Sequence, residues 1–180
     1  MRADAVRNRA RIVDAARELF REKGYDAPLD DIAKRAGVGP GTLYRHFPTR
    51  DDLVDAVMQA WVDRVNRSVE DVLTGGGDAR EVLLRWLETY VGLITVHKGG
   101  AARITGALDD AASPIRTKCE VLRGANQQVI DKLAGDLRPD VDSLQMARLA
   151  GGVATVADNG DLPAPAVRPM LAVIADGLLR

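Results

Sequence analysis

One short stretch decides the fold, Leu29-Asp-Asp-Ile-Ala-Lys-Arg-Ala-Gly-Val-Gly-Pro-Gly-Thr-Leu-Tyr-Arg-His-Phe47. Its spacing of apolar residues and glycines fits two short helices separated by a turn. Ala33 supplies the small side chain that closely crossing helices need, and Gly37 supplies a permissive backbone at the turn. Val38 and Leu43 are placed to fill the space between the two helices. The spacing predicts a helix-turn-helix, although an αα-hairpin with no nucleic-acid role meets it as well.

Helical periodicity continues on both sides of this stretch, whereas strand patterns are nearly absent. The helix before it ends at Gly24, where a left-handed cap is expected. After Pro48, the residues Thr49 and Asp52 predict the start of a long helix, which ends at the glycines of 75–77. Further helices are predicted over about 78–98, 101–108, 113–133, 142–157 and 165–179. We therefore expect an all-α chain with about nine helices.

Two of the later helices begin with recognisable cap signals. Asp78 and Glu81 stand three residues apart, as in a capping box. Ser113 and Pro114 have the residue types that are favoured at the N-cap and at the first helical position. These pairs predict where the two helices start.

The charges of the chain are divided unevenly along its length. The 180 residues hold 25 Lys and Arg against 26 Asp and Glu, a net charge of −1. Residues 1–50 hold 11 basic against 7 acidic side chains, and the other 130 hold 14 against 19. A small basic domain followed by a larger acidic one is the structure that this pattern indicates.

Composition excludes several functional classes. One cysteine and two distant histidines provide neither a disulfide framework nor a structural zinc site, so we expect no metal and no cofactor. The sequence has no phosphate-binding loop and no paired nucleophile and base, so we do not expect an enzyme. An apolar run long enough for a membrane span is absent, and the charged N-terminus is unlike a signal peptide. A cytoplasmic protein with no membrane partner is the expectation.

A longer segment around the opening stretch carries a family resemblance. Residues 31–53, preceded by 11–20 and by Gly24-Tyr25, closely resemble the DNA-binding domain of TetR-type bacterial transcriptional regulators. The family's Gly-Thr-Leu-Tyr-x-His-Phe core is intact over 41–47. The resemblance covers about the first 60 residues, and the rest is similar to the family in helix count and order. It implies a three-helix DNA-binding domain over 1–48 and a helical ligand-binding and dimerisation domain over 49–180.

The resemblance implies a specific function. The chain is expected to be a homodimeric repressor that binds a near-palindromic operator in double-stranded DNA and is released by a small-molecule effector. An activator, or a regulator that acts through a protein partner without an inducer, is the alternative. A DNA-compacting protein without sequence preference is disfavoured by the net charge of −1.

The resemblance also assigns the DNA contacts. Donors that suit phosphate oxygens are Thr42, Tyr44, His46 and Arg50, and the ring of Tyr44 can also pack partly into the core. His46 is expected to act as a neutral donor, because no carboxylate or nucleophile accompanies it. Lys34 and Arg45 add charge at the margin. The complete predicted set is Lys34, Gly39, Pro40, Gly41, Thr42, Tyr44, Arg45, His46 and Arg50.

The segment Gly39-Pro40-Gly41 departs from many relatives, which have Ser, Thr or Lys at the first two positions. It has no side-chain donor for base edges, and it can equally be a plain turn with proline at the start of a helix. Base reading then falls to contact of Pro40 with thymine methyl groups, to Thr42 or Arg45, or to DNA shape. Basic residues of an N-terminal arm, Arg2, Arg7 and Arg9, are the remaining candidates.

The larger domain contains polar and aromatic residues on or near its inward stripes, as a small-molecule site requires. The candidates for ligand binding are Trp61, Trp86, Tyr90, His97, Arg123 and Asn126. Core packing explains the two tryptophans at least as well as ligand binding does. His97 and Asn126 interrupt apolar seams, where an unpaired polar group costs about 1–3 kcal/mol. His97 can instead interact favourably with a helix C-terminus.

The last two predicted helices are apolar on more than one face. Residues 147–154 carry a stripe of small side chains, and the terminal helix has a second apolar face that contains Val173. Two such faces need two partners, which lie either within one bundle or in a second copy of the chain. We expect an intermolecular four-helix bundle. The predicted interface consists of Ala147, Gly151, Ala154, Met170, Leu171, Ile174 and Leu178.

Overall fold

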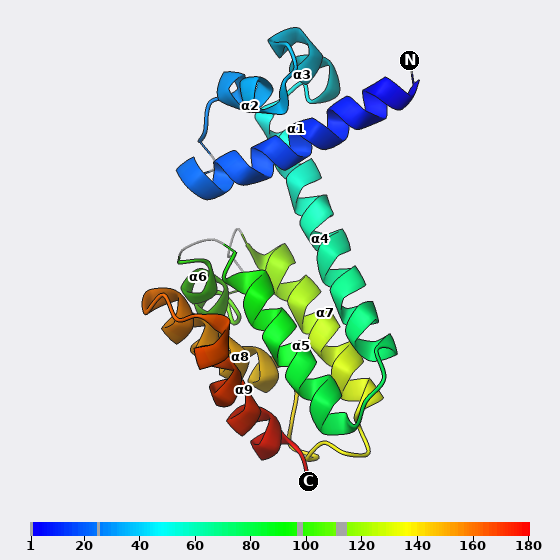
Figure 1. Cartoon of the computed structure of the whole chain (residues 1–180), viewed down its shortest axis with the longest axis vertical. Helices are drawn as coiled ribbons and strands as arrows, with labels where there is room; N and C mark the ends of the chain where they lie inside the picture. Colours follow the sequence, from blue (N-terminus) through cyan, green and yellow to red (C-terminus); the bar gives the residue numbers. More distant parts are fainter. Residues whose placement is uncertain (1, 25, 97–98, 111–114) are drawn as a thin grey trace. The chain divides into compact units, whose positions relative to one another are not determined.

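The computed structural model describes residues 2–24, 26–96, 99–110 and 115–180, and these residues form nine helices (Figure 1). The helices are α1 (Arg2–Lys23), α2 (Leu29–Ala36), α3 (Pro40–His46), α4 (Arg50–Thr74), α5 (Ala79–Ile94), α6 (Gly100–Gly106), α7 (Arg116–Lys132), α8 (Ser143–Asn159) and α9 (Ala164–Leu178). The predicted all-α class is therefore confirmed. Within the described residues, one isolated antiparallel bridge joins Leu137 to Leu179 beside the end of α9.

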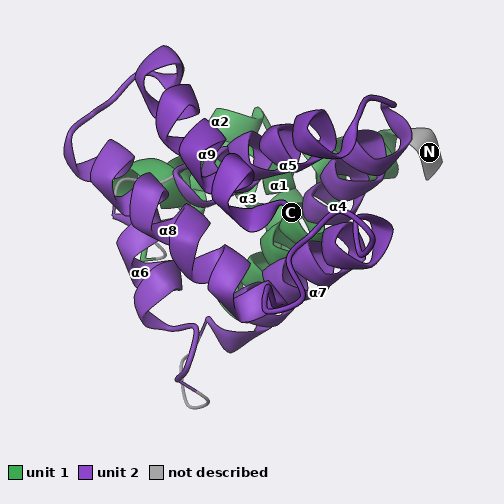
Figure 2. Ribbon diagram, turned by 90° about the horizontal axis from the view of Figure 1, so that it is seen from below, with its two compact units in different colours: residues 1–63 green, residues 64–180 purple. Residues whose placement is uncertain are grey.

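The chain divides into two compact units, residues 1–63 and residues 64–180 (Figure 2). The division falls inside α4, whose first residues belong to the N-terminal unit and whose last residues belong to the C-terminal unit. The functional boundary between residues 48 and 49 stays a prediction.

The N-terminal unit has its own core, made by α1, α2, α3 and the start of α4. Its buried side chains are Ile12, Val13, Ala15, Ala16, Leu19, Phe20, Ala27, Ile32, Ala33, Ala36, Leu43, Phe47, Leu53 and Ala56. Ala33 and Leu43 lie where the crossing of α2 and α3 requires them. Gly37 has a left-handed φ of 64°, and its N–H donates hydrogen bonds to the carbonyls of Ala33 and Lys34. The helix-turn-helix crossing therefore rests on the small residue and the glycine that the spacing indicated.

Helix starts follow the cap signals in the sequence. The Asp52 carboxylate accepts from the Thr49 hydroxyl at 2.7 Å, and the Asp52 N–H donates back to Thr49 Oγ1 at 3.1 Å. The predicted capping box at the start of α5 is present, with the Glu81 N–H donating to Asp78 Oδ1 at 2.8 Å. A second capping box, between Asp142 and Gln145, starts α8.

One predicted helix end differs from the structure. The helix expected to run to residue 98 ends at Ile94, and just past its end the Thr95 hydroxyl donates to the Val91 carbonyl at 2.8 Å. The predicted start at Ser113 and Pro114 lies outside the described residues, and α7 begins at Arg116.

The C-terminal unit is built around α5. This helix is buried on most of its surface and packs against α7, α8 and α9. Figure 1 shows α5, α8 and α9 lying alongside one another. Where α6 meets α8, a Cβ built on Gly151 would meet the Thr105 side chain inside van der Waals distance. The small side chains of α8 therefore serve a close helix crossing within the chain.

The core of this unit holds one short polar chain. Trp86 Nε1 donates to Asn126 Oδ1 at 2.8 Å, and Asn126 Nδ2 donates to the Ser143 carbonyl at 3.1 Å. Trp86 and Asn126 are both fully buried. The amide thus satisfies an indole N–H that burial would otherwise leave unpaired, and the Ser143 carbonyl satisfies the amide N–H in turn.

In the part of the chain that the structure describes, no helix has the length and hydropathy needed to cross a membrane.

Candidate nucleic-acid interface and small-molecule pocket

One side of α3 anchors it in the core and the other side faces outward. Leu43 and Phe47 are buried, whereas Pro40, Tyr44 and Arg45 are exposed. Tyr44 is 47% exposed, so it is at most partly packed into the core. The helix thus presents the side chains that the sequence predicted for DNA while its buried residues fix its orientation.

The polar side chains of α3 lie close to one another. Arg45 Nη2 donates to Thr42 Oγ1 at 3.0 Å, which joins two of the predicted DNA-binding residues. The His46 ring is half-buried and lies 6.4 Å from the Phe47 ring, centroid to centroid. Glycines 39 and 41 are exposed, and a Cβ on either would meet nothing within 4 Å. The start of α3 is therefore open backbone, accessible to a close neighbour such as a phosphate.

Apart from Gly39, which is the N-cap of α3, two of the predicted DNA-binding residues lie outside α3. Lys34 is exposed near the end of α2. Arg50 is half-buried, and its Nη1 donates to the Ala27 carbonyl at 2.8 Å. Arg50 thus ties the start of α4 to the loop before α2, a structural role that the sequence did not indicate.

The N-terminal residues form a helix rather than the arm that the sequence suggested. Helix α1 begins at Arg2, and Arg7 pairs with Asp4 within it. The Arg9 guanidinium lies 5.2 Å above the centroid of the Phe47 ring. Arg9 therefore contributes to the support of α3 through a cation–π contact.

Ion pairs fasten α1 to α2. Lys23 Nζ lies 2.8 Å from Asp31 Oδ2, and Arg35 Nη1 lies 2.7 Å from Glu22 Oε1. The hydrogen bond from Lys23 holds the pKa of the Asp31 carboxyl below its ordinary value, and the one from Arg35 does the same for Glu22. Both pairs are exposed, so their contribution to stability is small.

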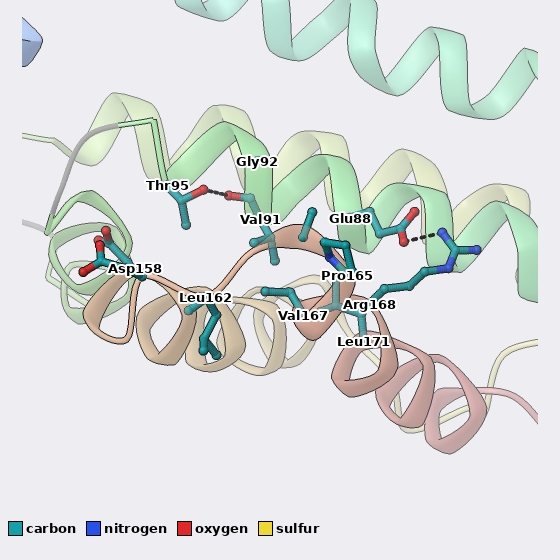
Figure 3. Close-up of a pocket in the computed structure, with 13 residues that line it drawn as sticks. Glu88, Val91, Gly92, Thr95, Asp158, Leu162, Pro165, Val167, Arg168 and Leu171 are labelled. Atoms are coloured by element: carbon teal, nitrogen blue, oxygen red, sulfur yellow. Dashed lines mark hydrogen bonds and ion pairs between the residues drawn. The ribbon is translucent and has the colours of Figure 1, made fainter.

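The C-terminal unit contains a pocket of about 810 Å³ between α5, the end of α8 and the start of α9 (Figure 3). Its lining residues are Glu88, Val91, Gly92, Thr95, Ala157, Asp158, Asp161, Leu162, Ala164, Pro165, Val167, Arg168 and Leu171. Most of them are apolar, and the volume lies in the range of small-molecule sites, about 300–1,000 Å³.

The sequence did not indicate this lining. On α5 it follows a stripe at helical spacing, Glu88, Val91, Gly92 and Thr95. A glycine inside a helix costs about 0.5–1 kcal/mol relative to alanine, so Gly92 was the available signal. The part of the lining from α8 and α9 depends on tertiary packing and has no local signature.

The predicted ligand-binding residues lie elsewhere. Five of the six are described, and none of these five lines the pocket; His97 lies outside the described residues. Trp86 and Asn126 bond each other in the core, as given above. Tyr90 packs edge-on against Trp86, with ring centroids 6.2 Å apart, and burial raises the pKa of its phenol. Trp61 belongs to the N-terminal unit, and Arg123 is exposed.

The predicted dimer residues are mostly internal. Within the single chain the structure buries Ala147, Gly151, Ala154, Leu171 and Leu178. The small-residue stripe of α8 packs against α6, and α9 packs against α5 and α8, so these side chains are used within one chain. Met170 and Ile174 are half-buried.

Other residues of α8 and α9 expose large apolar side chains. Leu149 is 44% exposed and Val156 is 53% exposed on α8, and Val173 is 73% exposed on α9. Leu149, Gly152, Val153 and Val156 are spaced three, one and three residues apart, which places them on one side of α8. We call this set, together with Met170, Val173 and Ile174 of α9, the exposed apolar face.

Comparison with known proteins agrees with this geometry. Residues 12–57 match the family of bacterial regulatory proteins described as the tetR family. An HTH-type transcriptional regulator from Staphylococcus aureus (strain bovine RF122 / ET3-1) is 48% identical over 60 residues, 33% of this chain and 32% of that protein. Another from S. aureus (strain USA300) is 47% identical over 64 residues, 35% of each chain. These matches span about a third of each relative's length.

Solved structures are similar over nearly the whole chain. A TetR transcriptional regulator from Streptomyces coelicolor is 31% identical with a TM-score of 0.69, over 95% of this chain and 98% of that one. A TetR-family regulator from Rhodococcus sp., 20% identical with a TM-score of 0.74 over 97% of this chain and all of that one, shares the fold. The chain belongs to the TetR family, whose members are DNA-binding transcriptional regulators and not enzymes.

Proposed function

We propose that this chain is a repressor that binds a near-palindromic operator as a homodimer and leaves it when a small molecule binds. The observation that carries the proposal is the outward face of α3, where hydrogen-bond donors surround an open helix start. The matched residues 12–57 include all of α3. A cytoplasmic location is part of the proposal.

The DNA contacts follow from the exposed donors. Tyr44 and Arg45 are exposed and Thr42 and His46 are half-buried on one short helix, which suits phosphate contacts beside the major groove. Lys34 adds a positive charge from α2. Because residues 39–41 carry no side-chain donor, discrimination between sequences rests more on DNA shape and on thymine methyl contacts than on base-edge hydrogen bonds.

The exposed apolar face supports the homodimer. Among the described residues, six large hydrophobic side chains are strongly exposed, and Leu149, Val156 and Val173 are three of them. Large apolar side chains that are exposed at helical spacing on one side of a helix are typical of an interaction site. A two-fold axis through this face would pair α8 and α9 with their copies in a four-helix bundle. The half-buried Met170 and Ile174 retain their predicted place in this interface.

The pocket supports release by a small molecule. It lies between α5 and the two helices of the exposed apolar face. A ligand that binds one arrangement of these helices more tightly than another shifts the dimer toward that arrangement, and the spacing of its two α3 helices shifts with it.

Selection of bound fragments from a random DNA pool at about 0.15 M salt tests the proposal, because nonspecific electrostatic binding is weak there. We expect a palindrome whose half-sites are about one DNA turn apart. Arg45→Ala should weaken binding of that palindrome, whereas Arg67→Ala, an exposed arginine in the C-terminal unit, should not. Failure to enrich any motif would overturn sequence-specific binding. A reporter gene under the recovered site then separates repression from activation.

A further inference from the structure

The charged and polar groups of the pocket already have partners in the protein. Arg168 Nη1 of α9 lies 2.5 Å from Glu88 Oε1 of α5. Asp158 Oδ2 accepts from the Gly99 N–H at 2.7 Å, and the Thr95 hydroxyl donates to the Val91 carbonyl at 2.8 Å. Asp161 is not free either. The polar lining is therefore satisfied without a ligand.

Between these polar ends the walls are apolar. Figure 3 shows Val91, Leu162, Pro165, Val167 and Leu171 between the Glu88–Arg168 pair at one end and Asp158 at the other. Binding of an apolar molecule against these side chains removes apolar surface from water and is favourable by roughly 25 cal/mol per Å² of buried apolar area.

Gly92 keeps one side of the pocket open. It is an exposed residue in the last turn of α5, and a Cβ built on it would meet nothing within 4 Å. Any larger residue at this position would project a side chain into free space beside Val91 and Thr95. The absence of a side chain at Gly92 therefore leaves this side of the pocket open.

We propose that this pocket binds an uncharged, mainly apolar small molecule, and that this molecule is the effector of the proposed repressor. The effector role rests on the proposed function, whereas binding of the molecule in the pocket does not. A charged ligand would lose part of its hydration and would face Glu88 and Arg168, which already neutralise each other, whereas a neutral ligand bears neither penalty. The pocket thus selects for low charge through groups that are already paired.

The direct test uses the neutral fluorophore N-phenyl-1-naphthylamine, which brightens in apolar sites, with the full chain. Three compounds with the same decyl chain then compete for the site: 1-decanol, decanoate and decyltrimethylammonium, each below its micelle concentration. We expect 1-decanol to displace the fluorophore at concentrations at least about tenfold lower than either ion, a difference of about 1.4 kcal/mol. Displacement by either ion as effective as that by 1-decanol would overturn the inference.

A pair of glycine variants locates the binding. Gly92→Leu should lower fluorophore affinity by at least about tenfold, because its side chain occupies the pocket. Gly124→Leu is the matched control, since Gly124 is also an exposed helical glycine whose Cβ would meet nothing within 4 Å. We expect its affinity to stay within about twofold of the unmodified chain. Equal effects of the two variants, or no effect of Gly92→Leu, would contradict the assignment.

Circular dichroism and thermal unfolding come first for both variants. If Gly92→Leu unfolds early, the more flexible Gly92→Met replaces it with Gly124→Met as its control. Release of a selected operator fragment by 1-decanol then separates the two claims. Binding that depends on Gly92 without DNA release rejects the effector role and keeps the pocket. Sequence-specific DNA binding without fluorophore binding rejects the pocket and keeps the DNA-binding regulator.

Discussion

Two exposed surfaces of this chain differ in chemistry. On α3, the exposed ring of Tyr44 is accompanied by donors such as Arg45 and Thr42. On α8 and α9, the exposed Val156 and Val173 have apolar neighbours at helical spacing. The first surface suits a charged, hydrated partner and the second suits a dry, apolar one. Salt should therefore weaken contacts at α3 and leave contacts at the exposed apolar face almost unchanged.

The largest expected effect comes from charging the exposed apolar face. Val156→Glu combined with Val173→Glu should give monomers and reduce operator affinity by roughly 100-fold, because burying unpaired carboxylates in an interface costs several kcal/mol. Size-exclusion light scattering and fluorescence anisotropy measure the two effects. Leu171→Glu would not serve, since Leu171 is buried within one chain.

The matched control for this double variant is Ala102→Glu with Gln128→Glu, which adds the same charge at exposed positions of α6 and α7. It should remain dimeric. A dimer in the Val156 and Val173 variant would place the interface on another surface.

The next largest effect is expected when hydrogen-bond donors are removed from α3. Tyr44→Phe with His46→Ala should weaken operator binding by roughly 10- to 100-fold, because each lost hydrogen bond to a phosphate contributes about 1 kcal/mol or more. The dimer should persist, in contrast to the variant of the apolar face. Anisotropy titrations at several salt concentrations measure the affinity. An unchanged operator affinity would reject the phosphate-contact roles of these two residues.

A smaller effect tests the buried polar chain of the C-terminal unit. Asn126→Ala leaves the buried Trp86 N–H without its partner and should lower the free energy of unfolding by about 1–3 kcal/mol. Urea unfolding monitored by tryptophan fluorescence measures the change. Gln127→Ala, at an exposed neighbouring position, should change it by less than about 0.5 kcal/mol. Equal losses of unfolding free energy in the two variants would mean that the hydrogen bonds of Asn126 do not stabilise the fold.

The smallest effect concerns the surface of the N-terminal unit. The pKa of Asp31 is lowered by the hydrogen bond from Lys23, so its stabilisation is present above the ordinary pKa of 3.8 and is lost as the pH falls through the lowered value. In Asp31→Asn the free energy of unfolding should therefore fall less steeply as the pH is lowered. Unfolding measured between pH 2 and 6 tests this, and the same acid slope in both proteins would contradict it.

The N-terminal unit could be predicted well because its signals are local. Gly37 at the turn, Ala33 at the crossing and the Thr49–Asp52 cap each act within a few residues of sequence. The outward face of α3 followed from the same spacing, since Leu43 and Phe47 fix which side is buried. The structural bond of Arg50 to Ala27 could not be predicted, because it joins residues 23 positions apart through a loop.

The C-terminal unit could be predicted only in outline. Periodicity indicated that α8 carries a packed small-residue face, but such a face suits a helix of the same chain as well as one of a partner. The structure gives that place to α6 and leaves Leu149 and Val156 outward. Asn126 interrupts an apolar seam for a similar reason, since its partner Trp86 is 40 residues away. The pocket lining is likewise assembled from α5, α8 and α9 and has no signature in any one of them.

Two adjacent glycines of α8 are constrained by different neighbours. At Gly151 any side chain would collide with Thr105 of the same chain, whereas at Gly152 a Cβ meets nothing within 4 Å. In a population of random variants under selection for function, we expect substitutions at Gly151 to be lost even when the protein is kept monomeric. Intolerance at Gly152 would instead reveal a second chain packed against it. The mutational spectra of two neighbouring codons therefore distinguish selection for the fold of one chain from selection for assembly.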